Sequence, residues 1–246
     1  MTKHVVYIPF TLDRDYGPPA AWVKTRIHMF VHSCYNSIMQ QDEPPEIWLF
    51  CGNKNKVLTD ELATLDNITL VYDNGYAVWE SLVQDNPDHI AVSRIDSDDA
   101  YHKDAFKYVI SETERLKNDH IVALSFHRWL CWHQPTDTLY RLNYQDFYPQ
   151  TVTKIFPRSC YSNYEEFISA VRLMHGFKLR GLAKEIYSLP EKMILSVRGD
   201  SNVSYVWCDR DDMNLLEHRN KIPEKPESVF SEFGIDSEYV ARMQKK

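Results

Sequence analysis

The sequence predicts an α/β protein built on a mixed sheet flanked by helices, with a mostly parallel N-terminal half. Strand-like and helix-like segments alternate over the first hundred residues, which is the signature of a parallel sheet with helices on its faces. After residue 100 the apolar segments are less regular, which predicts a mixed or antiparallel extension. A chain of 246 residues fits one large domain or a domain with a small appendage.

The N-terminal half should hold seven elements. Its strands are short apolar runs bounded by Pro, Gly, Asp or Asn. Its first helix carries Ile27, Phe30, Cys34 and Ile38 on one face and ends before two prolines. In chain order we expect strand 5–10, helix 22–41, strand 46–51, helix 56–65, strand 68–72, helix 76–84 and strand 90–95.

The C-terminal half is expected to be less regular. Its clearest helix is amphipathic, with Phe167, Ile168 and Val171 on one face. From about Asp209 the chain turns polar, and one small helix is expected within residues 231–246. The other expected elements are helix 103–117, a strand-like run at 121–132, strands 139–142 and 152–156, helix 164–174 and strand 193–197.

Composition and charge favour some classes of protein over others. A net charge of −7 and a pI near 5.8 are unlike a non-specific nucleic-acid binder, so a nucleic-acid acceptor gains no support. Five cysteines without a C-x-x-C spacing suit reduced thiols rather than a disulfide framework or a zinc site. The chain shows no signal peptide and no apolar stretch approaching 18 residues, which predicts a cytoplasmic protein without a transmembrane segment.

The most informative stretch follows the expected strand 90–95 and reads Arg94-Ile95-Asp96-Ser97-Asp98-Asp99. Parallel sheets bind ligands beyond the carboxyl ends of their strands, which is where this stretch begins. Neighbouring acids repel one another unless a cation or hydrogen-bond donors offset them. Asp96 and Asp98 can point to the same side, and their hard oxygens suit Mg²⁺ or Mn²⁺. Such an ion stabilises a departing nucleotide diphosphate, and Arg94 can add positive charge.

Other interpretations of these and nearby residues differ in strength. An EF-hand loop is excluded, because Tyr101 stands where Gly is needed and Lys107 where Glu is needed. A purely structural role stays open, with Asp98 or Asp99 capping the helix that follows. A histidine pair at residues 28 and 32 has zinc-ligand spacing but lacks the HEXXH glutamate, so a plain helix surface is expected there.

Several segments together resemble a known family. They are Arg26, Ser37-Ile38-Met39-Gln40-Gln41, Ile47-Trp48-Leu49-Phe50, the stretch from Ser93 to Ala100 with its Arg-x-Asp-x-Asp-Asp element, and Asn202-Val203-Ser204. From about residue 22 to 205 the chain resembles the family of rhamnosyltransferases, which have the GT-A glycosyltransferase fold. The resemblance implies a GT-A-like domain at 1–208, with a nucleotide-sugar-binding half at 1–100 and an acceptor half at 101–208. A polar extension at 209–246 follows it.

The resemblance also implies the ligands of the site. The donor would be a nucleotide-diphosphate sugar, and a divalent metal, Mn²⁺ or Mg²⁺, would bind at Asp98. Asp96 would lie on the ribose or sugar and beside the metal. Nucleoside contacts would come from Thr11 and Asp73, and Arg26 would reach the diphosphate.

One departure from the family pattern concerns the metal. Such enzymes often carry a late histidine ligand shortly before the Asn-Val-Ser element, and here that region offers Arg198 and Asp200 instead. Arg198 would supply fixed positive charge to the diphosphate and weaken the need for a metal. Asp200 would instead serve as a further metal ligand.

Acid–base candidates lie around the expected helix 164–174. Glu165 and Glu166 open this helix, where one of them could take the proton of the acceptor hydroxyl. Acids are also favoured in a first helical turn for structural reasons, so that interpretation stays open. His175, just past the helix, is a ligand, an acid–base group or an ordinary helix-end histidine.

These observations predict a hexosyl- or deoxyhexosyltransferase, rhamnosyltransferase included, that acts on a saccharide or another hydroxyl acceptor. The acceptor is expected to approach over Trp129, Trp132 and Tyr161, because aromatic faces suit sugars. With Glu165 or Glu166 as base, the reaction would be a direct displacement. Two alternatives remain: a metal-dependent phosphoesterase or nuclease using the same acids, and a non-catalytic nucleotide-sugar-binding module.

Overall fold

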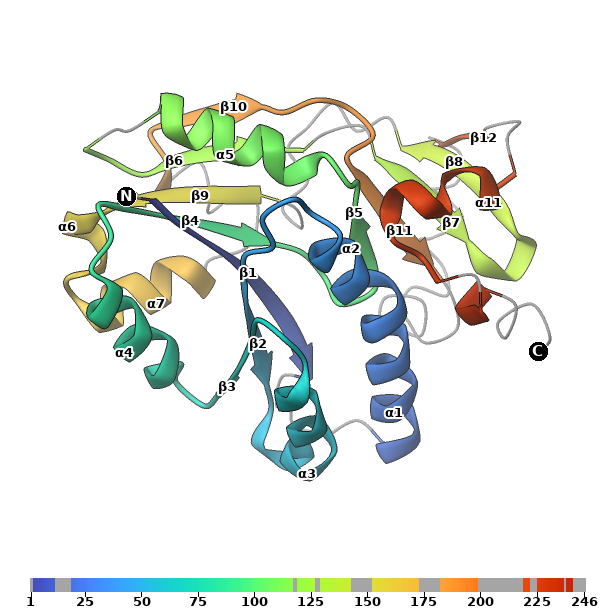
Figure 1. Cartoon of the computed structure of the whole chain (residues 1–246), viewed down its shortest axis with the longest axis horizontal. Coiled ribbons are helices and arrows are strands. Elements are labelled where there is room, and N and C mark those ends of the chain that lie inside the picture. Colours follow the sequence, from blue (N-terminus) through green and yellow to red (C-terminus); the bar gives the residue numbers. More distant parts are fainter. Residues whose placement is uncertain are drawn as a thin grey trace.

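Two sheets that lie side by side organise the chain in the computed structural model (Figure 1). The structure describes residues 2–11, 19–116, 119–126, 129–142, 152–172, 182–198, 219–221, 225–236 and 238–240. No helix in these ranges is both long enough and apolar enough to span a lipid bilayer.

The larger sheet has seven strands in the order β10-β6-β9-β4-β1-β2-β3. Strands β1 to β4 run parallel to one another, whereas β9 is antiparallel to both β4 and β6. The expected mixed sheet with a parallel N-terminal half is therefore confirmed. The strands are β1 (Thr2–Thr11), β2 (Glu46–Cys51), β3 (Ile68–Tyr72), β4 (His89–Arg94), β6 (Val122–Ser125), β9 (Val152–Pro157) and β10 (Glu185–Ser188).

The smaller sheet has five strands in the order β12-β8-β7-β11-β5. It corrects one prediction, because the strand-like run expected at 121–132 is divided between β6 and the second sheet's β7. Both pieces are buried, so the apolar pattern continues while the chain passes from one sheet to the other. The strands are β5 (Asp99–Tyr101), β7 (Leu130–His133), β8 (Thr138–Leu142), β11 (Ile194–Arg198) and β12 (Arg219–Lys221).

Helices cover both faces of the larger sheet. Because side chains alternate along a strand, Val6 and Ile8 of β1 face one helix layer, and Val5 and Tyr7 face the other. One layer contains α1 (Ala20–Met29), the π-helical turn η1 (Phe30–Tyr35), α2 (Asn36–Met39), η3 (Asp60–Thr64) and α5 (Ala105–Arg115). The other contains α4 (Tyr76–Asp85) and α7 (Tyr164–Arg172). Short helical segments complete the described chain: η2 (Asn53–Asn55), α3 (Lys56–Thr59), η4 (Gln134–Thr136), α6 (Arg158–Tyr161), α11 (Glu227–Phe230) and η5 (Ser231–Phe233).

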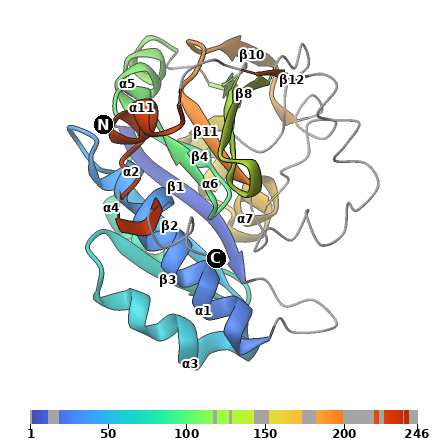
Figure 2. The same cartoon turned by 90° about the vertical axis from the view of Figure 1, so that its right-hand side faces the viewer.

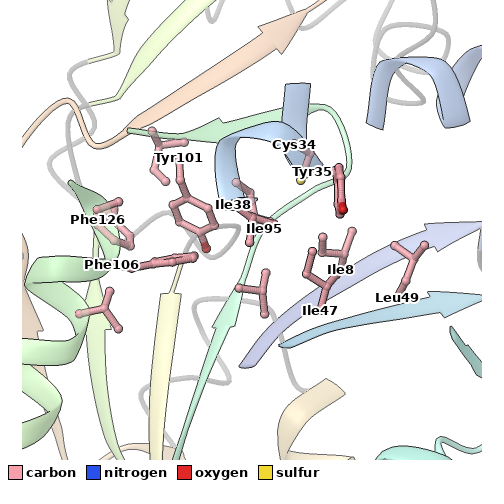
Figure 3. Packing of buried hydrophobic residues seen from close by; sticks show 14 of the residues in the cluster. Ile8, Cys34, Tyr35, Ile38, Ile47, Leu49, Ile95, Tyr101, Phe106 and Phe126 are labelled. Carbon is pink, nitrogen blue, oxygen red and sulfur yellow. The ribbon is translucent and has the colours of Figure 1, made fainter. Parts of the chain in front are cut away.

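The apolar face expected for the helix at residues 22–41 packs against the larger sheet. Figure 3 shows Cys34 and Ile38 directed toward Ile8 and Ile95 of the sheet layer, and all four side chains are fully buried. The expected helix is present from Ala20 to Met39, with a π-helical turn in its middle. We refer to this side of the sheet as the α1 face and to the other side as the α7 face.

The C-terminal segment packs against the five-stranded sheet, and α11 lies close to it (Figure 2). Phe230, Phe233 and Tyr239 are buried in one apolar cluster with Trp132 and Leu195. His32 in η1 holds the same segment, because its Nδ1 lies 2.9 Å from Asp236 Oδ2. The expected boundary at residue 208 lies outside the described residues and stays a prediction.

Candidate functional site

The candidate site lies at the edge of the sheet where strands β1 to β4 end. Because these strands are parallel, Thr11, Asp73 and the acids after β4 follow strand ends on one side of the sheet. Asp96, Asp98 and Asp99 each offer a carboxylate oxygen, and the three oxygens lie within 4.8 Å of one another. This is the carboxylate cluster that the sequence predicts.

The cluster forms where the chain passes from the larger to the smaller sheet. β4 ends at Arg94, and the Asp99 N–H donates to the Asp96 carbonyl at 3.0 Å to close a turn. Asp99 then begins β5 and pairs with Ser196 of β11. The helix that follows, α5, has Asp104 as its N-cap residue, so the alternative in which Asp98 or Asp99 caps it is wrong.

One half of the cluster, the inner pair, is buried on the α1 face. Arg26 Nη1 of α1 lies 3.1 Å from Asp98 Oδ2, and Arg26 Nη2 donates to Ser97 Oγ at 2.6 Å. The two charged side chains are only 7% and 9% exposed. The guanidinium also lies 5.4 Å from the centre of the Trp22 ring. Arg26 is therefore engaged with Asp98 and Ser97, and its contact with the diphosphate stays a prediction.

Electrostatics favour this buried pair over a neutral one. Burial disfavours the charged guanidinium, but the carboxylates of Asp98, Asp96 and Asp99 outweigh it and raise the pKa of Arg26 above its ordinary value. Breaking such a pair by removing one partner leaves the other charge buried without compensation. Asp98 thus contributes to the fold as well as to the cluster.

The other half, the outer pair, is more accessible. Arg94 Nη2 donates to Asp96 Oδ1 at 2.8 Å, and the side chains are 14% and 24% exposed. Arg94 is the last residue of β4 and pairs in register with Tyr7 of β1, so its side chain lies on the α7 face. The outer pair can therefore meet a ligand at the sheet edge more readily than the inner pair.

The chemistry of the cluster fits the expected metal. Three carboxylate oxygens within 4.8 Å form a hard donor set of the kind that Mg²⁺ and Mn²⁺ use. Asp96, Asp98 and Asp99 are the residues that would hold the ion. A cation there would share Asp98 with Arg26 and Asp96 with Arg94.

The two glutamates proposed as base lie on α7. Glu165 and Glu166 are exposed in the first turn of α7. At the other end of that helix, Arg172 donates to the Asp73 carbonyl at the sheet edge. Arg172 follows Glu165 by seven positions, roughly 10 Å along the helix axis. Tyr164, at the start of the same helix, donates to the Asn74 carbonyl at 2.6 Å, so both ends of α7 reach the segment after β3, and the role of Glu165 or Glu166 as base stays a prediction.

The three aromatic residues expected to receive the acceptor are core residues. Trp129, Trp132 and Tyr161 are 2%, 1% and 3% exposed. Trp129 Nε1 donates to the Phe126 carbonyl, and Trp132 Nε1 donates to Asp137 Oδ1. Buried rings offer no face to a sugar, so this prediction is wrong for the structure as described. Large rings with one polar edge are as well suited to a satisfied core position as to a binding surface.

The remaining predicted residues divide into placed and undescribed ones. Thr11 is buried, and its carbonyl accepts from the Gly52 N–H at 2.6 Å. Asp73 is exposed at the end of β3, with a left-handed backbone at φ 58°. For Arg198 only the backbone is described, in β11 opposite His133. His175 and Asp200 lie outside the described residues, so their roles stay predictions.

Arg172 and Tyr7 are site residues that the sequence reasoning missed. Arg172 lies with its guanidinium carbon 5.6 Å from the centre of the Phe50 ring, near the end of β2. Tyr7 packs on Phe50 with ring centres 4.6 Å apart. An arginine at the end of an amphipathic helix is ordinary in sequence, so only the direction of that helix over the sheet reveals its place.

Two cavities in the described part of the chain lie away from the cluster. One, of about 260 Å³, is lined by residues of α5 and of the turn after α2, including Phe106 and Ile110. The other, of about 300 Å³, lies between the smaller sheet and the C-terminal segment, including His102 and Phe233. Neither of these two cavities is lined by a residue of the carboxylate cluster.

Comparisons with known proteins add distant likenesses. No family model matches the chain, and no curated protein matches it. Among solved structures, 4-diphosphocytidyl-2C-methyl-D-erythritol synthase from Anaerococcus prevotii DSM 20548 is 14% identical, with 99% of this chain and 95% of that chain covered and a TM-score of 0.36. The 2-C-methyl-D-erythritol 4-phosphate cytidylyltransferase of Francisella tularensis is 10% identical, with 83% of this chain and 98% of that chain covered and a TM-score of 0.43.

A third similar structure is named as a nucleotide-diphospho-sugar transferase. It comes from Desulfovibrio desulfuricans G20 and is 10% identical, with 88% of this chain and 97% of that chain covered and a TM-score of 0.37. At these identities and TM-scores the likenesses carry no argument about activity. Function must be argued from the residues at the sheet edge.

Proposed function

We propose that this chain transfers a sugar from a nucleotide-diphosphate donor to an acceptor hydroxyl at the edge where β1 to β4 end. The observation that carries the proposal is the carboxylate cluster itself. Its three oxygens lie within 4.8 Å of one another, just beyond the end of a parallel strand. Ligand sites of such sheets lie at this edge, and clustered carboxylates need cations there.

In this transfer the protein mainly has to stabilise the leaving diphosphate with positive charge, and it forms no covalent bond to the sugar itself. The proton of the acceptor hydroxyl passes to a base, the role predicted for Glu165 or Glu166. As the acceptor oxygen bonds to the sugar, the bond from the sugar to the diphosphate breaks, so negative charge grows on the diphosphate. Arg94, at the accessible half of the cluster, is placed to offset that charge with charge-assisted hydrogen bonds. A divalent cation held by Asp96, Asp98 and Asp99 would supply Lewis-acid stabilisation of the same group.

The resemblance to rhamnosyltransferases suggests a deoxyhexose donor. A thermal-shift panel of dTDP-rhamnose, UDP-glucose, GDP-mannose and CDP, with and without Mn²⁺, tests the proposal, because a ligand that binds only the folded chain raises the melting temperature. We expect at least one nucleotide sugar to stabilise the protein and Mn²⁺ to strengthen the effect. No stabilisation by any member of the panel would contradict the proposal.

A variant connects that result to the cluster. Asp96→Asn removes a charge from the outer pair and should abolish the ligand-induced shift. Asp66→Asn is the matched control, because Asp66 is an exposed aspartate before β3, at the opposite edge of the sheet. Two results with wild-type protein would favour the alternatives: hydrolysis of a phosphodiester without any sugar nucleotide favours a phosphoesterase or nuclease, and nucleotide-sugar binding without turnover favours a binding module.

A further inference from the structure

Two arginines stand on either side of an aromatic pair at the sheet edge, on the α7 face. Tyr7 of β1 pairs in register with Arg94 of β4, so the two side chains are neighbours on that face. The Tyr7 and Phe50 rings lie 4.6 Å apart at their centres, and Arg172 covers Phe50 at 5.6 Å. The order across the edge is therefore Arg94, Tyr7, Phe50 and Arg172.

Arg172 is fixed in place from the backbone side. Its Nη2 donates to the Asp73 carbonyl at 2.6 Å, which joins the end of α7 to the end of β3. Its side chain is exposed, and no carboxylate pairs with it among the residues that the structure describes. By contrast, Arg26, Arg94 and Arg158 each lie within 3.1 Å of a carboxylate oxygen. Arg172 thus presents a fixed guanidinium to the edge.

The electrostatics of Tyr7 show that both guanidiniums act on one spot. Burial raises the pKa of Tyr7, Arg94 and Arg172 lower it, and Asp96 raises it again. Lys154 also lies near Arg94, because burial and then Arg94 lower the pKa of its ammonium to about 7. Asp96 offsets the charge of Arg94, whereas no carboxylate among the described residues pairs with Arg172, so an anion bound here would be stabilised by that guanidinium.

We infer that Arg94 and Arg172 form an anion site across Tyr7 and Phe50 that takes the diphosphate of a nucleotide donor. This inference rests on the proposed function and adds a residue and a ligand group to it. A guanidinium offers a planar fork of donors that matches phosphate oxygens, and two forks suit two linked phosphates. Arg172 is a positioning residue here, because it holds the donor at the edge beside Asp96.

Isothermal titration with UDP, GDP, CDP, dTDP and inorganic pyrophosphate tests the inference. Arg172→Ala removes charge-assisted hydrogen bonds, so it should weaken the binding of nucleoside diphosphates and of pyrophosphate roughly tenfold or more. The corresponding nucleosides should bind equally to both proteins, which a merely structural defect would not produce. Arg172→Lys keeps the positive charge without the planar fork of donors. Its affinity for diphosphates should therefore lie between those of wild type and Arg172→Ala.

Arg158→Ala is the matched control, because Arg158 is also an exposed arginine that donates to a backbone carbonyl, that of Asn86. It lies by the start of β4, at the opposite edge, and its loss should leave diphosphate binding unchanged. If Arg172→Ala does not fold, the titration of Arg172→Lys decides: weaker diphosphate binding with unchanged nucleoside binding supports the anion site, and unchanged diphosphate binding overturns it.

The outcomes separate this inference from the proposed function. Equal diphosphate binding by wild type and both Arg172 variants would overturn the anion site and leave the proposed function standing. If wild type binds no nucleoside diphosphate, the proposed function fails. In that case pyrophosphate binding that is lost in Arg172→Ala would still support the anion site, and no pyrophosphate binding would overturn it as well.

Discussion

The inner and outer pairs of the carboxylate cluster have the same composition, one arginine and one aspartate, but different surroundings. Arg26–Asp98 is 7% and 9% exposed on the α1 face, whereas Arg94–Asp96 is 14% and 24% exposed on the α7 face. Removing one partner of a buried pair costs far more than removing one of an exposed pair. Two aspartates of one motif therefore serve different ends: Asp98 mainly holds the fold, and Asp96 is available to a ligand.

The largest effect should follow from breaking the inner pair. Asp98→Ala leaves the Arg26 guanidinium buried without its partner, so we expect the free energy of unfolding to fall by about 3–5 kcal/mol. Urea denaturation measures the loss. The double variant Arg26→Met with Asp98→Ala should recover part of it, because no unpaired charge remains. A loss below about 1 kcal/mol for Asp98→Ala would show that the two pairs do not differ as described.

The free energy of unfolding should depend on pH through Lys154, which lies on the α7 face. Burial lowers the pKa of this ammonium to about 7, from about 10.5 in the unfolded chain. Between these values the unfolded state binds more protons, so the stability of the native chain rises with pH through this window. Lys154→Met should remove that rise when unfolding free energies are compared at about pH 7 and about pH 10. Parallel pH profiles for the two proteins would contradict the assignment.

The free energy of unfolding should also depend on pH in a lower range, through His4 on the α1 face. This side chain is close to Ser93 Oγ at 2.7 Å, and burial lowers its pKa to about 3. The unfolded chain binds a proton below about 6.5, so stability falls as pH drops from there toward 3. His4→Gln should flatten this fall in acid denaturation curves. An unchanged acid limb would show that His4 is not the group responsible.

The smallest effect on stability should come from the outer pair. Asp96→Asn should lower the free energy of unfolding by less than Asp98→Ala does, because the outer pair is less buried than the inner pair. Its effect on nucleotide diphosphate binding should be large by comparison, which isothermal titration can measure against Asp66→Asn. A severe folding defect with unchanged binding would reverse the roles that we assign to the two pairs.

Local features of the sequence predicted the framework well. β2 and β3 begin and end at the expected residues, because each is a short apolar run next to Pro, Gly or Asp. The carboxylate cluster was also predictable, since Asp96, Asp98 and Asp99 are close in sequence and follow a strand end.

Features that depend on the tertiary arrangement were not predictable. The partners Arg26 and Asp98 are 72 positions apart, and Arg172 and Asp73 are 99 apart, so no local pattern joins them. The placement of α7 over the sheet, which brings Arg172 to Asp73, has no local signal in the sequence either. The burial of Trp132 follows from packing against the C-terminal segment, which comes almost a hundred residues later.

The most direct test of the central claim is a crystal structure of the chain with a nucleoside diphosphate and Mn²⁺. We predict that the diphosphate lies between Arg94 and Arg172 beside Asp96, while Arg26 and Asp98 stay paired. A nucleotide bound away from this edge, for example in the cavity beside Phe233, would contradict the claim.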